Sequence, residues 1–222
     1  LFLGRLMIDD GGFVSNPAFQ GQGTPTIDTR ELFFDGNSQG GIMGGAATAV
    51  AQDWNRAVIG VPAMNYSTLL QRSTDWDTYK AIFDPAYPDP TDHVLTIGIV
   101  QMLWDRGETN GYAQHLTRDP YPDTPNHQVL IHEAFGDHQV ANVATEVEAR
   151  SLGARVHRPA LAEGRSSARH LLWGMEELEG RYDGSAIVVW DSGSPAPPAG
   201  NVAPREGEDP HGDPRASKEA RE

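Results

Sequence analysis

Short apolar segments separated by helical stretches constrain the fold more than any other feature of this sequence. Residues 56–62 (RAVIGVP), 128–134 (QVLIHEA) and 185–190 (SAIVVW) have the length and composition of buried strands. A fourth, shorter strand is predicted at 31–35 (ELFFD). Strands that alternate with helices are typical of a mostly parallel sheet flanked by helices, so we expect the α/β class.

Two segments carry clear helical patterns. Residues 42–52 are rich in alanine and other small residues, and residues 142–152 are amphipathic. Gly153 follows the second segment directly, in the position where glycine ends helices. The first helix follows the predicted strand at 31–35 through a glycine-rich turn at 36–41, which gives a strand, turn and helix in sequence.

About 60 residues, 64–126, separate the second and third predicted strands. This length exceeds what a simple crossover connection needs. The segment combines aromatic residues with clustered prolines, which indicates a helical insertion packed over the edge of the sheet. The insertion is interpreted either as a cap over a pocket or as a folded surface excursion.

The glycine-rich turn contains the pattern G-x-S-x-G, as Gly36-Asn37-Ser38-Gln39-Gly40. A serine at the apex of a strained strand-to-helix turn needs neighbours without bulky side chains, which explains the glycines. Ser38 is therefore the candidate nucleophile. The backbone amide of Gln39, at the start of the helix, is the candidate oxyanion donor. The alternative is that Ser38 only caps the helix.

A nucleophilic serine needs a base and a group that orients the base. Asp137 follows the third strand, at the sheet edge where Ser38 is expected, and His211 is the only histidine beyond the fourth strand. His138 is an alternative base and Asp191 an alternative orienting acid. The remaining histidines are interpreted as surface or core residues; they are His93, His115, His127, His132, His157 and His170.

These residues resemble the α/β-hydrolase superfamily, in its serine esterase and lipase-like members. The resemblance lies in 32–45 (LFFDGNSQGGIMGG), 135–140 (FGDHQV) and 209–212 (DPHG). It implies hydrolysis of an ester or amide through an acyl-enzyme intermediate. Ser38 would be the nucleophile, His211 the general base and then acid, and Asp137 the group that fixes the histidine tautomer. An insertion at 64–126 also matches a superfamily cap.

One departure from the superfamily pattern concerns the start of the chain. In the superfamily the serine turn follows the fifth strand, whereas only 30 residues precede Glu31 here. We therefore expect residues 1–191 to form the C-terminal part of such a domain, with its N-terminal strands missing. Residues 192–222 would be a proline-rich surface loop that carries His211, followed by a charged tail. An upstream segment or a second chain would then complete the sheet. The sequence has no HGGG-like segment, so the second oxyanion donor is not identified.

Charge and composition exclude other classes of function. The chain has 17 Lys and Arg residues against 31 Asp and Glu, a net charge of −14 that disfavours binding to nucleic acid and to anionic lipid. It has no cysteine, which excludes disulfides, thiolate catalysis and zinc sites built from sulfur. No apolar run reaches the roughly 20 residues that span a bilayer.

Signatures of cofactors and metals are also missing from the sequence. His132-Glu133 begins an HExxH-like string, but Gly136 stands where the second histidine would be needed. We therefore expect no metal, no cofactor and a small-molecule ester as the substrate. Two alternatives stay open: a non-catalytic scaffold or binding protein of the same fold, and a peptidase or acyltransferase.

Overall fold

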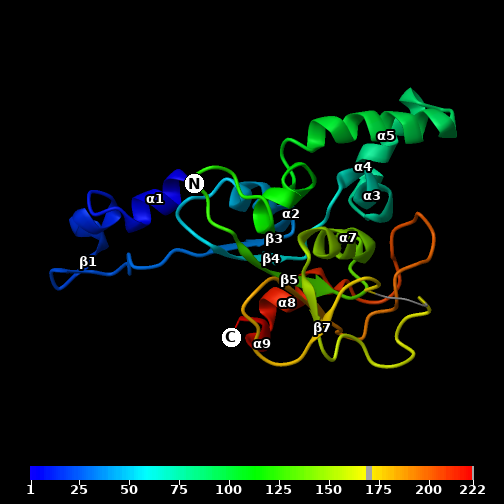
Figure 1. The fold of residues 1–222 in the computed structure, drawn as a ribbon. Helices are drawn as coiled ribbons and strands as arrows, with labels where there is room; N and C mark the ends of the chain where they lie inside the picture. Colours follow the sequence, from blue (N-terminus) through cyan, green and yellow to red (C-terminus); the bar gives the residue numbers. More distant parts are fainter. Residues whose placement is uncertain (169–171, 222) are drawn as a thin grey trace.

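A computed structural model describes residues 1–168 and 172–221 of the chain (Figure 1). Within them, six strands form one parallel sheet in the order β3-β4-β5-β8-β6-β7. The strands are β3 (Phe34–Asn37), β4 (Arg56–Gly60), β5 (Gln128–Ala134), β6 (Arg155–His157), β7 (Glu177–Leu178) and β8 (Ala186–Trp190). The chain is thus an α/β protein, as the alternation of strands and helices predicts.

One face of the sheet carries the main core. Ile59 lies opposite Ile131, which lies opposite Ile187, and all three side chains are fully buried. Helices α2 (Gln39–Ala49), α6 (Ala113–Thr117) and α7 (Asn142–Leu152) form a layer over this face. The core therefore lies between the central strands and these three helices.

Small residues bring α2 unusually close to the sheet. A Cβ atom at Gly44 would lie 2.6 Å from the ring of Phe34, and one at Gly41 would lie 2.6 Å from the carbonyl oxygen of Gly60. These distances are too short for any side chain. The small residues that predict the helix thus also allow it to pack directly on β3 and β4.

Some boundaries match the sequence prediction and others differ from it. The strand at 128–134 and the helix at 142–152 are confirmed, and Gly153 ends the helix with a left-handed φ of 69°. The predicted strand at 31–35 is wrong in its bounds, because β3 runs from Phe34 through the first glycine of the predicted turn to Asn37. The prediction of four strands missed β6 and β7, which are too short to show a strand period.

The segment 64–126 is helical, as expected. It contains α3 (Tyr66–Leu69), η3 (Leu70–Arg72), α4 (Trp76–Ala86), α5 (Pro90–Trp104) and η4 (Thr109–Gly111), and it ends with α6. The η4 turn and α6 pack against α2, whereas α4 and α5 extend away from the sheet (Figure 1). One side of α5 exposes a stripe of apolar residues to solvent: Val94, Leu95, Ile99, Met102 and Leu103.

The first 33 residues form an extended arm with little packing of its own. It consists of α1 (Phe2–Ile8), η1 (Phe13–Ser15), η2 (Pro17–Phe19) and the antiparallel pair β1 (Gln20–Gly21) and β2 (Thr24–Pro25). Val14 is the only buried residue of the arm. The arm reaches sideways from the body of the molecule (Figure 1).

The C-terminal segment packs against the sheet at its end. After β8 the chain continues without regular structure to η5 (Pro210–Gly212), α8 (Asp213–Ala216) and α9 (Lys218–Arg221). Pro210 and Pro214 are buried, and both η5 and α8 contact β5. The sequence predicted a surface loop and a charged tail in this region, whereas its turns η5 and α8 are anchored on the sheet. No helix in the described part of the chain has the length and apolarity needed to cross a bilayer.

Candidate functional site

Ser38 occupies the sharp turn between β3 and α2. Its backbone has φ 59° and ψ −123°, a conformation that non-glycine residues rarely adopt. The turn is held on both sides: the Ser38 N–H donates to the carbonyl oxygen of Gly60 at 2.9 Å, and its carbonyl accepts the N–H groups of Gly41 and Ile42. Surrounding hydrogen bonds thus maintain the strained geometry at Ser38.

The two glycines of the serine motif have different roles. A Cβ atom at Gly36 would lie 2.3 Å from the carbonyl oxygen of Gly40, so position 36 must be glycine for the strand and helix to meet. A Cβ atom at Gly40 would meet nothing within 4 Å. The expectation that both glycines are needed for close approach is therefore wrong for Gly40, because a side chain at position 40 would point into open space.

The polar groups at the turn are accessible. Ser38 is half-buried, and its hydroxyl makes no hydrogen bond within residues 1–168 and 172–221. Gln39 is exposed and opens α2, so its N–H has no acceptor inside the helix. The first turn of a helix carries a partial positive charge, which favours an anion at this position.

Asp137 lies in the loop directly after β5 and is almost fully buried. Its Oδ1 accepts the backbone N–H groups of Gln139 at 2.8 Å and Val140 at 2.9 Å. The start of the same loop is held by the Asn142 side chain, which accepts the N–H of Gly136 at 2.8 Å. The carboxylate therefore has a fixed position and orientation.

His211 pairs with Asp137. Nδ1 of His211 lies 2.8 Å from Oδ2 and 3.1 Å from Oδ1 of the carboxylate. A carboxylate only accepts hydrogen bonds, so the contact assigns the hydrogen to Nδ1. Nε2 has no hydrogen bond with any described residue, which leaves it available to a further group. Burial lowers the pKa of His211, but the hydrogen bond and charge of Asp137 outweigh it, so the pKa is raised.

Neither the alternative base, His138, nor the alternative acid, Asp191, takes part in this pair. His138 directs Nε2 to the carbonyl oxygen of Glu206, at 3.2 Å. Asp191 forms an ion pair with Arg165, with Oδ2 at 2.5 Å from Nε. His211 and Asp137 are thus the histidine and acid that the structure joins. Of the remaining histidines, His170 lies outside the described residues.

Ser38 and Asp137 follow β3 and β5 of the same parallel sheet, with β4 between these two strands. Parallel strands place their carboxyl ends at one edge, and two strand spacings correspond to about 10 Å. The structure therefore brings Asp137 and His211 into contact and puts Ser38 on the same edge. It contains no hydrogen bond between Ser38 and His211.

Asp209 also belongs to the candidate site, although its role was not predicted from the sequence. Its Oδ1 accepts the backbone N–H groups of His211 and His138, each at 3.1 Å, and its Oδ2 accepts the Gln139 side-chain amide at 2.8 Å. The pattern Asp-Pro at 209–210 is the signal that could have found it, because aspartate before proline is a common helix start. Asp209 caps η5 and also joins it to the loop of Asp137.

A metal centre is not found in the described part of the chain, since no three His, Asp or Glu side chains gather there as a metal would need. Comparisons with known proteins add no assignment. No protein-family model matches the chain, and no curated protein or solved structure is detectably similar to it.

Proposed function

We propose that this protein is a serine hydrolase that cleaves carboxylic esters through an acyl-enzyme intermediate. The observation that carries the proposal is the contact between Nδ1 of His211 and the buried carboxylate of Asp137, at the sheet edge that also holds Ser38 in its strained turn. The order serine, acid, histidine along the chain is the order of an α/β hydrolase. We further propose that the fold is α/β-hydrolase-like and that residues 64–126 are its cap.

In the proposed mechanism each residue has one task. Nε2 of His211 takes the hydroxyl proton of Ser38 while Oγ attacks the ester carbonyl carbon. The N–H of Gln39 stabilises the oxyanion that forms. His211 then gives its proton to the departing alcohol, and a water molecule, activated by the same nitrogen, releases the acid and restores Ser38. Asp137 keeps Nε2 directed at the serine throughout.

Hydrolysis of p-nitrophenyl esters tests this proposal. We expect turnover by the chain and a loss of about 10³-fold or more in Ser38→Ala. Ser15→Ala, in the N-terminal arm, is the matched control and should retain full turnover. A fluorophosphonate probe should label the protein at Ser38 and leave Ser38→Ala unlabelled. Equal turnover by the chain and by Ser38→Ala would refute the role of this serine.

A second candidate is a non-catalytic scaffold of the same fold. The observation in its favour is that the Ser38 hydroxyl makes no hydrogen bond to His211. Catalytic hydrogen bonds are often loose without substrate, so this observation does not outweigh the first proposal. A folded sample that neither turns over esters nor reacts with the fluorophosphonate would favour the scaffold.

A further inference from the structure

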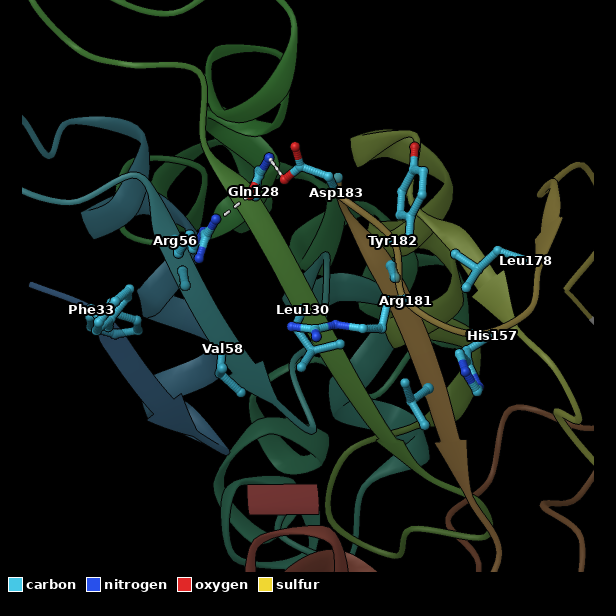
Figure 2. Close-up of a pocket in the computed structure, with 16 residues that line it drawn as sticks. Phe33, Arg56, Val58, Gln128, Leu130, His157, Leu178, Arg181, Tyr182 and Asp183 are labelled. Carbon is cyan, nitrogen blue, oxygen red and sulfur yellow. Dashed lines mark hydrogen bonds between the residues drawn. The ribbon is translucent and has the colours of Figure 1, made fainter. Parts of the chain in front are cut away.

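The second face of the central sheet is apolar, and it is uncovered where β4, β5 and β8 begin. Opposite the buried isoleucines, the strands present Val58, Leu130 and Val188, which are only half-buried. Strands that are apolar on both faces are typical of parallel sheets covered on both sides. Here the first and third residues of β4, β5 and β8 instead line an open hollow of about 680 Å³ (Figure 2). The sequence is thus patterned for a cover that the described residues of one copy do not provide.

Two arginines lie at this hollow without an acidic partner in the described part of the chain. Arg56 donates only to the side chain of Gln128, at 3.3 Å, and Arg181 forms no hydrogen bond or ion pair with any described residue (Figure 2). Asp183, also at the rim, accepts a hydrogen bond from Gln128 instead. Acidic residues outnumber basic ones in this chain, whose net charge is −14. Two arginines without acidic partners beside an apolar surface therefore indicate what kind of group binds there. They favour an occupant that is apolar and carries carboxylates at one end.

Helix α1 has this chemistry. None of its residues is buried, and Phe2, Leu3 and Leu6 point one exposed apolar side to solvent, with Phe2 88% exposed. Asp9 and Asp10 follow the helix directly. Seven helical residues extend about 10 Å, which equals the two strand spacings from β4 across β5 to β8.

The arm that carries α1 is weakly attached to its own body. Arg5 of α1 forms a bidentate ion pair with the half-buried Asp53, in which Nε donates to Oδ2 at 3.0 Å. The Arg5 side chain is 53% exposed, and a single pair of this kind contributes about 1 kcal/mol to stability. Gly4 of α1 also packs against Leu32 and Trp54. Since Val14 is the only buried residue among the first 33, exchanging the arm would nevertheless expose little apolar surface.

We propose that two copies of the chain exchange their N-terminal arms, so that α1 of each copy lies in the sheet hollow of the other. The apolar side of α1 would rest on Val58, Leu130 and Val188, and Asp9-Asp10 would meet Arg56 and Arg181. In a dimer with a two-fold axis this contact forms twice. Both open sheet faces are then covered, and the two arginines of each copy are paired. The proposal is independent of the proposed enzymatic function.

Sedimentation equilibrium of the 222-residue chain tests the proposal. We expect a dimer whose Kd rises about 100-fold in Arg56→Glu/Arg181→Glu and equally in Asp9→Arg/Asp10→Arg. Combining all four changes should restore the Kd to within about tenfold, because the charges are again opposite. The matched control, Lys80→Glu/Arg106→Glu, makes the same charge change on the insertion and should leave the Kd unchanged.

Disulfide trapping gives a second measurement that does not depend on dimer stability. The chain has no cysteine, so Leu6→Cys and Leu130→Cys chains can be mixed and oxidised without background. We expect a cross-linked heterodimer, and none when Met102→Cys replaces Leu130→Cys. A monomer at all concentrations would overturn the proposal. So would a dimer that withstands the arginine reversals, or one that is dissociated by Val94→Asp/Ile99→Asp on α5 but not by Phe2→Asp/Leu6→Asp.

Discussion

The backbone N–H of His138 donates to Oδ1 of Asp209 at 3.1 Å, which joins the loop of Asp137 to the turn of His211. The same carboxylate accepts the N–H of His211 and the side-chain amide of Gln139. Burial raises the pKa of Asp209, but these hydrogen bonds together lower it below its usual value, so the group stays ionised. Asp209 therefore sets the spacing between the two residues that pair at the site.

Replacing Asp209 should reduce turnover without weakening substrate binding. In Asp209→Ala the η5 turn loses its cap and its link to the acid loop, so Nε2 of His211 is no longer held in place. We expect kcat to fall about 10- to 100-fold with KM nearly unchanged, because small misplacements of a base have effects of this size. Steady-state kinetics with a p-nitrophenyl ester measure both parameters.

Two comparisons separate positioning from general destabilisation. Asp209→Asn keeps one acceptor oxygen and should recover part of the lost kcat. Asp213 is an exposed neighbour whose side chain makes no hydrogen bond with a described residue, so Asp213→Ala should have no effect. If the loss of kcat in Asp209→Ala equals the loss of folded protein by circular dichroism, Asp209 has only a structural role.

The serine turn should tolerate alanine at one glycine and not at the other. Gly36→Ala would place a Cβ atom 2.3 Å from the carbonyl oxygen of Gly40, a clash that only a backbone shift can relieve. We expect a loss of about 2–4 kcal/mol in the free energy of unfolding. Gly40→Ala points into open space within α2 and should be neutral or stabilising by up to about 1 kcal/mol. Urea denaturation of both variants measures the difference, and equal losses would contradict this account.

The sequence predicted the central strands because their pattern is strong. Residues 128–134 form a strand around the apolar run 129–131, and 142–152 form a helix with a glycine stop. Both predicted bounds are correct. The strand before the serine was misplaced because glycine and asparagine at 36–37 indicate a turn, whereas pairing with β4 keeps them extended. Tertiary pairing, which local composition does not report, decided this boundary.

The candidate site was predictable where residues follow strand ends. Asp137 was identified because a parallel sheet places the residue after β5 at the same edge as Ser38. Asp209 was missed because its role depends on contacts with residues 138 and 139, far away in the sequence. The uncovered sheet face could not be predicted either. The sequence shows that each strand has apolar residues on both sides, but not which side is covered.

Glu148 should make the stability of the fold depend on pH. Its side chain on α7 is fully buried, and both carboxylate oxygens are without a hydrogen bond in the described structure. Burial raises the pKa of Glu148 to about 8, against the lowering effect of the nearby Thr109 hydroxyl and with a smaller contribution from the charge of Glu108. The folded state therefore holds the proton of Glu148 more tightly than the unfolded state does. The stabilisation that this proton gives is complete below the unfolded pKa, near 4.5, and is lost as the pH rises through about 8.

Glu148→Gln removes this dependence. Between pH 5 and pH 8 the unmodified chain should lose about 4 kcal/mol more of its free energy of unfolding than the variant does. Urea denaturation at the two pH values measures this difference. Glu163→Gln, at an exposed position, is the matched control and should follow the unmodified chain. If Glu148→Gln and the unmodified chain show the same pH dependence, Glu148 does not bind the inferred proton in the folded state.

The pH dependence of ester hydrolysis should report the contact between His211 and Asp137. The proposed base must be neutral, so kcat/KM should rise with pH through the pKa of His211, which Asp137 raises above 6.5 against the opposing effect of burial. Asp137→Asn removes the charge and leaves burial, so the rise should move to lower pH while kcat falls about 10³- to 10⁴-fold. In Asp191→Asn the rise should stay in place, because that carboxylate pairs with Arg165. A rise that moves in Asp191→Asn and not in Asp137→Asn would assign the orienting role to Asp191.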